Sequence, residues 1–158
     1  MNPTPRPISP RSTRGTRGCT GFTLIETMVT FGIAGVLSSV AYPSLEGQVM
    51  RARRSDALVA LMQAQLAQER FRANNASYGS GADAGVRPTS PAGHYRVEVV
   101  SSGASGFELL ASAVSGQARD AKCRYLRLTL ADATLVYASG SDSTTANGSD
   151  VNRVCWSR

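Results

Sequence analysis

The sequence predicts an α+β protein in which a long N-terminal helix packs on a four-stranded antiparallel sheet. The first observation is that residues 22–73 contain a single proline and otherwise have the pattern of an apolar and then an amphipathic helix. The second is that four short runs of alternating polar and apolar residues follow residue 74. The length of 158 residues, 42% of them hydrophobic, suits one domain and excludes a multi-domain enzyme or a polytopic membrane protein.

A basic leader precedes the helix. Residues 1–21 contain four arginines and no acidic residue, whereas the formal net charge of the whole chain is +6. A strongly basic chain normally suggests nucleic-acid binding. Here most of the excess positive charge lies in the leader, and the rest of the chain is only weakly basic.

Residues 22–43 are predicted to cross a membrane as a helix. The stretch from Phe22 to Tyr42 has one charged residue, Glu26, and about 20 apolar residues span a hydrocarbon core. The arginines of the leader place residues 1–21 in the cytoplasm, so the chain beyond the helix is exported. A carboxylate inside a membrane helix costs roughly 2–3 kcal/mol. Glu26 therefore either lies near the lipid headgroups or pairs with a buried cation.

The residues at the start of this helix resemble the processing site of type IV prepilins and the related pseudopilins. The run GFTLIE, residues 21–26, stands behind a basic leader and leads into an apolar helix. The resemblance implies that a prepilin peptidase cuts between Gly21 and Phe22 on the cytoplasmic face and methylates the new amino terminus of Phe22. It further implies that Glu26 neutralises the amino terminus of a neighbouring subunit during filament assembly. The leader is longer than that of many major pilins, and Thr27 stands where leucine is commoner.

The helix is expected to continue beyond the membrane as an amphipathic segment, residues 44–73. The resemblance implies that Gly35 softens the helix and that Pro43 kinks it. An apolar stripe is expected to cover the sheet: Leu58, Leu61, Met62 and Leu66. Three arginines are interpreted as a solvated helix face just outside the membrane, with contact to lipid headgroups or nucleic acid as the alternative: Arg51, Arg53 and Arg54.

Residues 74–158 are expected to form an exported β-rich head. A loop rich in glycine, proline and serine opens it. Alternating runs then predict four strands, at residues 94–100, 106–114, 123–130 and 134–138. This architecture agrees with the type IV pilin fold that the resemblance implies.

The cysteines fit an exported head. Cys19 lies in the leader and is expected to leave with it, whereas Cys123 and Cys155 remain as an even pair on the oxidising side. A disulfide between them would close a C-terminal loop of about 33 residues and contribute roughly 3–4 kcal/mol in the chain-entropy model. A C-terminal loop closed by a disulfide is also what the resemblance to pilins implies.

No constellation of residues indicates catalysis, so the chain is expected not to be an enzyme and to need no cofactor or metal. The single histidine, His94, stands beside a strand start, and no Cys/His cluster has zinc spacing. Asp142, Asn147 and Asp150 lack the spacing of a calcium loop and are interpreted as a solvated segment.

The resemblance implies a structural role, namely that of a minor type IV pilin similar to the PilE-like minor pilins of Gram-negative bacteria. Its expected partners are other pilin subunits, the prepilin peptidase/N-methyltransferase and the pilus assembly machinery of the inner membrane. The chain is expected to cross the inner membrane once, with a cytoplasmic N-terminus and a periplasmic head, and then to enter an extracellular pilus. One alternative is a type II secretion pseudopilin, although these usually lack a terminal disulfide.

A second alternative is a pilin that captures extracellular DNA for uptake. Four cations surround the first head cysteine, and an aromatic residue follows the second. A disulfide would bring them together, with cations for phosphates and an aromatic ring for stacking on bases. The residues concerned are Arg119, Lys122, Arg124, Arg127 and Trp156. The competing interpretation is that Trp156 packs at the end of the sheet and that Arg127 lies on its solvated face.

Overall fold

The computed structural model describes residues 21–157, without the side chains of Val40 and residues 42–44. The chain divides into two compact units, residues 1–40 and 41–158. Helix α1 spans Leu24–Arg72, which confirms the predicted long N-terminal helix to within two residues at each end. Gly35 and Pro43 both lie inside α1, and the kink expected there stays a prediction. Residues 1–20 of the leader, with Cys19, lie outside the described residues.

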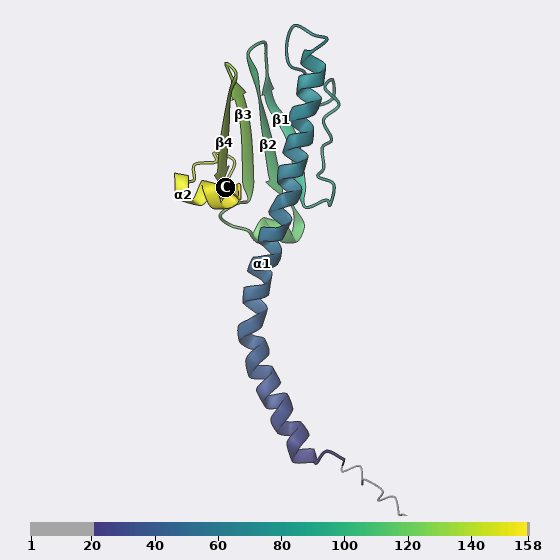
Figure 1. Ribbon diagram of the computed structural model, residues 1–158, viewed down its shortest axis with the longest axis vertical. Coiled ribbons are helices and arrows are strands. Elements are labelled where there is room, and N and C mark those ends of the chain that lie inside the picture. Colours follow the sequence, from purple (N-terminus) through teal and green to yellow (C-terminus); the bar gives the residue numbers. More distant parts are fainter. Residues whose placement is uncertain (1–20, 158) are drawn as a thin grey trace, which may run out of the picture. The chain divides into compact units, whose positions relative to one another are not determined.

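The head contains the predicted four-stranded sheet. Its strands are β1 (Tyr95–Ser102), β2 (Gly106–Ala113), β3 (Tyr125–Ala131) and β4 (Thr134–Gly140). They are antiparallel and lie in the order β1-β2-β3-β4, so each strand pairs with its neighbour in sequence (Figure 1). Asp132 and Ala133 form the two-residue turn between β3 and β4, and both have positive φ, as a tight hairpin turn of right-handed strands requires.

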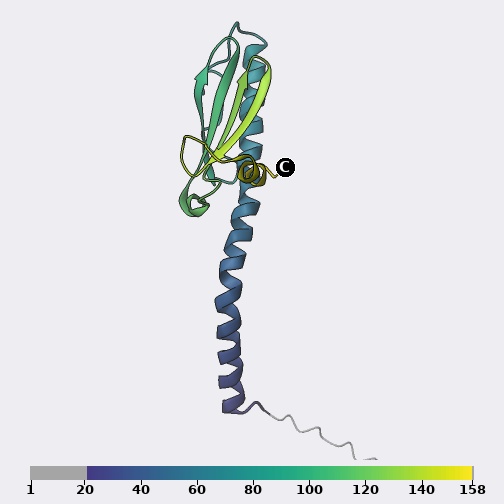
Figure 2. The same ribbon diagram turned by 90° about the vertical axis from the view of Figure 1, so that its left-hand side faces the viewer.

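The C-terminal part of α1 runs along this sheet (Figures 1 and 2). The helix residues in the core recur at helical spacing: Ala57, Ala60, Leu61 and Ala64. They pack with inward side chains of all four strands, among them Val97, Leu109, Leu126 and Tyr137. The two elements therefore form a helix layer on a sheet layer with one core between them.

The predicted apolar stripe on α1 is wrong at two of its four positions. Leu61 is buried and Leu58 is half-buried, but Met62 is 68% exposed and Leu66 is 50% exposed. At about 100° per residue, Met62 and Leu66 lie roughly 140° and 180° around the helix from Ala57. The face of α1 that meets the sheet is centred on alanines. Alanine has a lower hydropathy than leucine or methionine, so a stripe chosen by hydropathy is shifted toward the larger side chains.

The segment between α1 and β1 is tied to the helix by two buried or half-buried polar side chains. Gln68 is fully buried, and its amide donates to the Gly79 carbonyl at 2.8 Å and accepts from the Gly79 N–H at 3.0 Å. Asp56 accepts from the Ser90 hydroxyl at 2.5 Å and from two backbone N–H groups of residues 92 and 94. Partial burial raises the pKa of Asp56, but these hydrogen bonds outweigh it and hold the pKa below its ordinary value.

Two short elements were not predicted. A 3₁₀ helix, η1 (Ser115–Arg119), connects β2 to β3, and a helix, α2 (Ser149–Cys155), lies beside β4 near the C-terminus (Figure 1). The sequence signal for α2 is weak because seven residues make only two turns. Its N-cap is Gly148, which offers no side-chain cap.

Candidate functional site

The predicted disulfide is confirmed. Cys123 and Cys155 are joined with a Cα–Cα distance of 5.4 Å and a sequence separation of 32. Both cysteines are buried in the core cluster. The bond fastens α2 to the segment that leads into β3, so α2 is anchored beside the sheet.

Replacing Cys155 with serine is expected to lower the free energy of unfolding of the C-terminal unit by about 2–4 kcal/mol, because the unfolded chain regains the entropy of an open loop. Cys123→Ser should have the same effect, and Cys19→Ser should leave the mature protein unchanged. Denaturant unfolding of the three variants measures the difference. Free thiols at both head positions in protein from the cell surface would contradict the bridge.

Trp156 is packed and does not present its ring to solvent. The side chain is 8% exposed, its indole N–H donates to the Ala138 carbonyl at 3.1 Å, and its ring meets Tyr137 edge to face at 4.9 Å. An indole held in this way is not free to stack on a base. Trp156 therefore closes the end of the core.

The four cations proposed for DNA contact have different environments. Arg119 and Lys122 are exposed. Arg124 is half-buried and donates from Nε to the Ala118 carbonyl at 2.8 Å. Arg127 lies on the sheet face turned away from α1, pairs with Glu108 across the β2–β3 ladder and donates to the Ser143 carbonyl. Two of the four cations are thus exposed, and one of these, Arg119, makes an ion pair with Glu46 at 3.4 Å.

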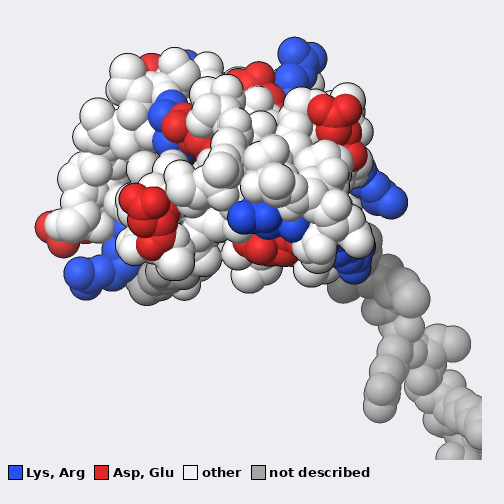
Figure 3. Space-filling model, turned by 90° about the horizontal axis from the view of Figure 1, so that it is seen from above, with Lys and Arg blue, Asp and Glu red and all other residues white. Residues whose placement is uncertain are grey.

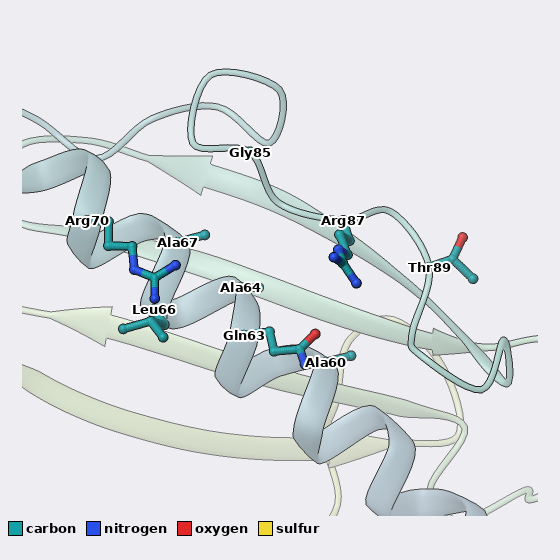
Figure 4. A pocket seen from close by; sticks show the side chains of 9 residues that line it. All are labelled: Ala60, Gln63, Ala64, Leu66, Ala67, Arg70, Gly85, Arg87 and Thr89. Atoms are coloured by element: carbon teal, nitrogen blue, oxygen red, sulfur yellow. The ribbon is translucent and has the colours of Figure 1, made fainter.

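A groove beside α1 presents two further arginines that the sequence analysis did not consider. It has a volume of about 410 Å³, and its sides are α1 and the segment before β1 (Figure 4). Arg87 reaches from that segment toward α1, and Arg70 stands on the helix (Figure 4). Both residues are exposed, and neither side chain has a hydrogen-bond or ion-pair partner among the described residues. No acidic residue is among the described groove residues, which are Ala60, Gln63, Ala64, Leu66, Ala67, Arg70, Gly85, Arg87 and Thr89.

The end of the head that is uppermost in Figure 1 has no continuous basic area. Viewed end-on, basic and acidic side chains are interspersed over the surface (Figure 3). Any binding of a polyanion at this end would bring acidic groups close to phosphates. The acid-free groove is therefore the more favourable cationic feature.

A buried polar network joins α1 to η1 and α2. The Arg54 guanidinium donates to both carboxylate oxygens of Asp120, at 2.7 and 2.9 Å, and to the Val154 carbonyl at 3.4 Å. Gln117 donates to Asp120 at 3.3 Å and to the Tyr95 hydroxyl at 3.1 Å. Burial raises the pKa of Tyr95 to about 12, so this hydroxyl stays neutral at physiological pH. The prediction that Arg54 belongs to a solvated face is wrong.

The residues predicted to be processed, Gly21 and Phe22, lie just before α1. Thr23 precedes the helix, and its hydroxyl accepts from the Glu26 N–H at 3.3 Å, which is half of a Thr-x-x-Glu capping box. Glu26 stands in the first turn, where a negative charge is favourable to the helix dipole. Phe22 is exposed, and Glu26 has no ion pair among the described residues. Glu26 is thus available to a partner from outside the described chain.

Two further findings concern residues 21–157. No helix in this part of the chain is both long enough and apolar enough to span a membrane. The same residues contain no cluster of His, Cys, Asp or Glu suited to a metal ion. Asp142 instead accepts hydrogen bonds from Thr144, and Asn147 donates to the carbonyl of Lys122.

Residues 16–42 match the profile of the prokaryotic N-terminal methylation motif. Together with the helix-on-sheet fold, this match defines a type IV pilin, a protein that is anchored in a membrane and then assembled into a pilus with other pilins after peptidase processing. Residues 43–127 match the profile described as type IV minor pilin ComP, DNA uptake sequence receptor. The chain belongs to this family of minor pilins, a family of structural subunits. No match occurs among the curated proteins.

Proposed function

We propose that this minor pilin is cut between Gly21 and Phe22, methylated on Phe22 and held by residues 22–43 as a single span of the inner membrane before assembly. The match to the methylation motif supports the processing step. The leader arginines favour a cytoplasmic N-terminus and a periplasmic head. The inner-membrane assembly machinery then transfers the subunit to an extracellular pilus of a Gram-negative bacterium. The family match favours this role over a secretion pseudopilin.

We further propose that the head captures extracellular DNA for uptake. The observation that carries this proposal is the match of residues 43–127 to a family described as a DNA uptake sequence receptor. The groove beside α1 supplies a site of suitable chemistry, since its two arginines are unpaired and exposed within the described chain. Arginine suits phosphate because its planar fork of donors binds two oxygens at once.

The dimensions of the groove also suit a nucleic-acid backbone. Its helix side extends from Ala60 to Arg70, which is about 15 Å at 1.5 Å per residue. A phosphate backbone carries a charge every few ångströms, so one strand can contact both arginines along that length. The helix side of the groove contains alanines, whose small side chains leave room for the nucleic-acid backbone to approach.

Replacing Arg70 and Arg87 together with glutamine is expected to weaken duplex binding and to reduce its dependence on salt. The plot of log K against log salt concentration has a negative slope. Each lost phosphate contact should reduce the magnitude of this slope by about 0.9. The measurement is a titration of labelled duplex DNA with the full chain in detergent at 50–200 mM salt. Arg153→Gln, which removes an exposed arginine of α2 outside the groove, is the matched control.

A second double variant, Arg119→Gln with Lys122→Gln, tests the alternative site near the disulfide. If it loses binding while the groove variant keeps the wild-type slope, DNA binds near the disulfide. If the wild-type chain binds no DNA, capture of DNA fails as a function while the structural role of the subunit stands.

A further inference from the structure

A second groove lies at the base of the C-terminal unit, between α1 and η1. Its volume is about 310 Å³. Apolar side chains form one part of it and charged side chains the other. The residues that line it are Leu45, Glu46, Val49, Met50, Arg53, Gly116 and Arg119.

The two arginines of this groove converge on one point. Arg53 Nη1 and Arg119 Nη2 lie 3.8 and 3.9 Å from the position that a Cβ on Gly116 would occupy. Because Gly116 has no side chain, the space between the guanidinium groups stays open. A phosphate placed there can accept hydrogen bonds from both.

An apolar strip adjoins this cationic point. Leu45 and Val49 are one turn apart on α1, and both leave much of their surface exposed to solvent. The only acidic residue among the described lining residues is Glu46, which is 3.4 Å from Arg119. Both partners of this ion pair are well exposed, so it is weak and easily exchanged for another anion. The groove therefore combines a net positive charge with an apolar surface.

We propose that this groove binds the headgroup of an anionic phospholipid, with phosphatidylglycerol as the representative ligand. The phosphate lies between Arg53 and Arg119, and the glycerol backbone and upper acyl carbons lie against Leu45 and Val49. The net charge of the groove favours an anionic over a zwitterionic headgroup. This inference rests on the proposed membrane anchor, residues 22–43.

The groove follows the proposed anchor directly in the sequence. Leu45 follows the apolar stretch that ends at Tyr42, and Arg53 lies about two turns of α1 beyond Leu45. Helix side chains lean toward the N-terminus, and arginine extends its charged end along its stem toward the interface. The Arg53 guanidinium, which lies beside Gly116, is therefore a suitable partner for a lipid phosphate that borders the proposed anchor.

The test places the full-length chain in nanodiscs that contain phosphatidylglycerol and phosphatidylethanolamine in equal amounts. Native mass spectrometry after mild removal of bulk lipid measures which lipid remains bound. The wild-type chain should retain phosphatidylglycerol over phosphatidylethanolamine, with a preference of about fivefold for each arginine. The double variant Arg53→Gln with Arg119→Gln should return the ratio to that of the bulk lipid. Arg153→Gln, which changes an exposed arginine outside the groove, should keep the wild-type ratio.

The outcomes separate the lipid site from the anchor. If the wild-type chain inserts into the nanodisc but shows no preference for phosphatidylglycerol, the proposed lipid site is overturned and the anchor stands. The same holds if the double variant keeps the wild-type preference. A chain that fails to insert overturns the anchor and the site with it. A last arm adds inorganic phosphate in millimolar excess to the lipid-loaded chain: displacement of the lipid by free phosphate overturns the lipid assignment, and retention supports it.

Discussion

Replacing Arg54 with methionine is expected to lower the free energy of unfolding of the C-terminal unit by about 3–5 kcal/mol. The change leaves the Asp120 carboxylate buried without the cation that now donates to both of its oxygens. The side chains of the pair are only 10% and 6% exposed, so water cannot take the place of the guanidinium. Denaturant unfolding of the purified variant measures the loss.

Two controls distinguish charge burial from loss of packing. Arg119→Met breaks an ion pair that is 72% and 43% exposed, and should cost less than about 1 kcal/mol. Arg54→Met combined with Asp120→Leu removes both buried charges and should recover much of the loss, because burying each charge carried its own desolvation cost. An Arg54→Met variant as stable as the wild type would show that Asp120 finds another partner.

Replacing Glu26 with valine is expected to reduce incorporation into filaments severely while leaving cleavage and membrane retention intact. The proposed cleavage would create a charged amino group at Phe22, and a buried unpaired charge costs several kcal/mol. Glu26 stands in the first turn of α1, four residues after Phe22, and has no ion pair among the described residues. Its carboxylate is therefore available to neutralise the amino terminus of a neighbouring subunit.

The capping contact at the start of α1 makes a sharper control available. Glu26→Gln keeps a side chain that suits the Thr23 capping box but removes the charge. If Glu26 pairs with the amino terminus of a neighbouring subunit, Glu26→Gln should incorporate into filaments as poorly as Glu26→Val. Glu26→Asp, which keeps the charge, should be partly incorporated. Wild-type incorporation of the glutamine variant would assign Glu26 to helix capping alone. The measurement is the amount of each variant in sheared filaments relative to the membrane pool, and Gly21→Val gives the uncleaved reference.

Features with a local pattern could be predicted from the sequence. The alternation in residues 106–114 and 123–130 predicts β2 and β3 to within two residues, because one face of the sheet is buried and the other is solvated. The disulfide could be predicted because only two cysteines remain beyond the leader. In each case a few neighbouring residues, or a pairing without competitors, determine the outcome.

Features set by distant partners could not be predicted. Arg54 stands in a run of arginines that looks solvated, and its partner Asp120 is 66 residues away. Arg70 and Arg87 line the same groove, and Gln68 and Asp56 help to hold the segment that carries Arg87 on α1. Tertiary contacts of this kind leave no periodic signal in the sequence.

The order of the strands in the sheet allows the head to fold progressively during the proposed export. Since every strand pairs with its predecessor, two hairpins close over the short loops 103–105 and 132–133, and such low-contact-order pairing is fast. In the proposed topology the N-terminus stays in the cytoplasm, so the chain beyond the anchor emerges in sequence order. The rest of α1 comes first, then β1 to β4, and Cys155 follows them. The sheet can assemble vectorially, strand by strand, before the thiol of Cys155 arrives. Oxidation then locks a completed sheet and does not guide its formation.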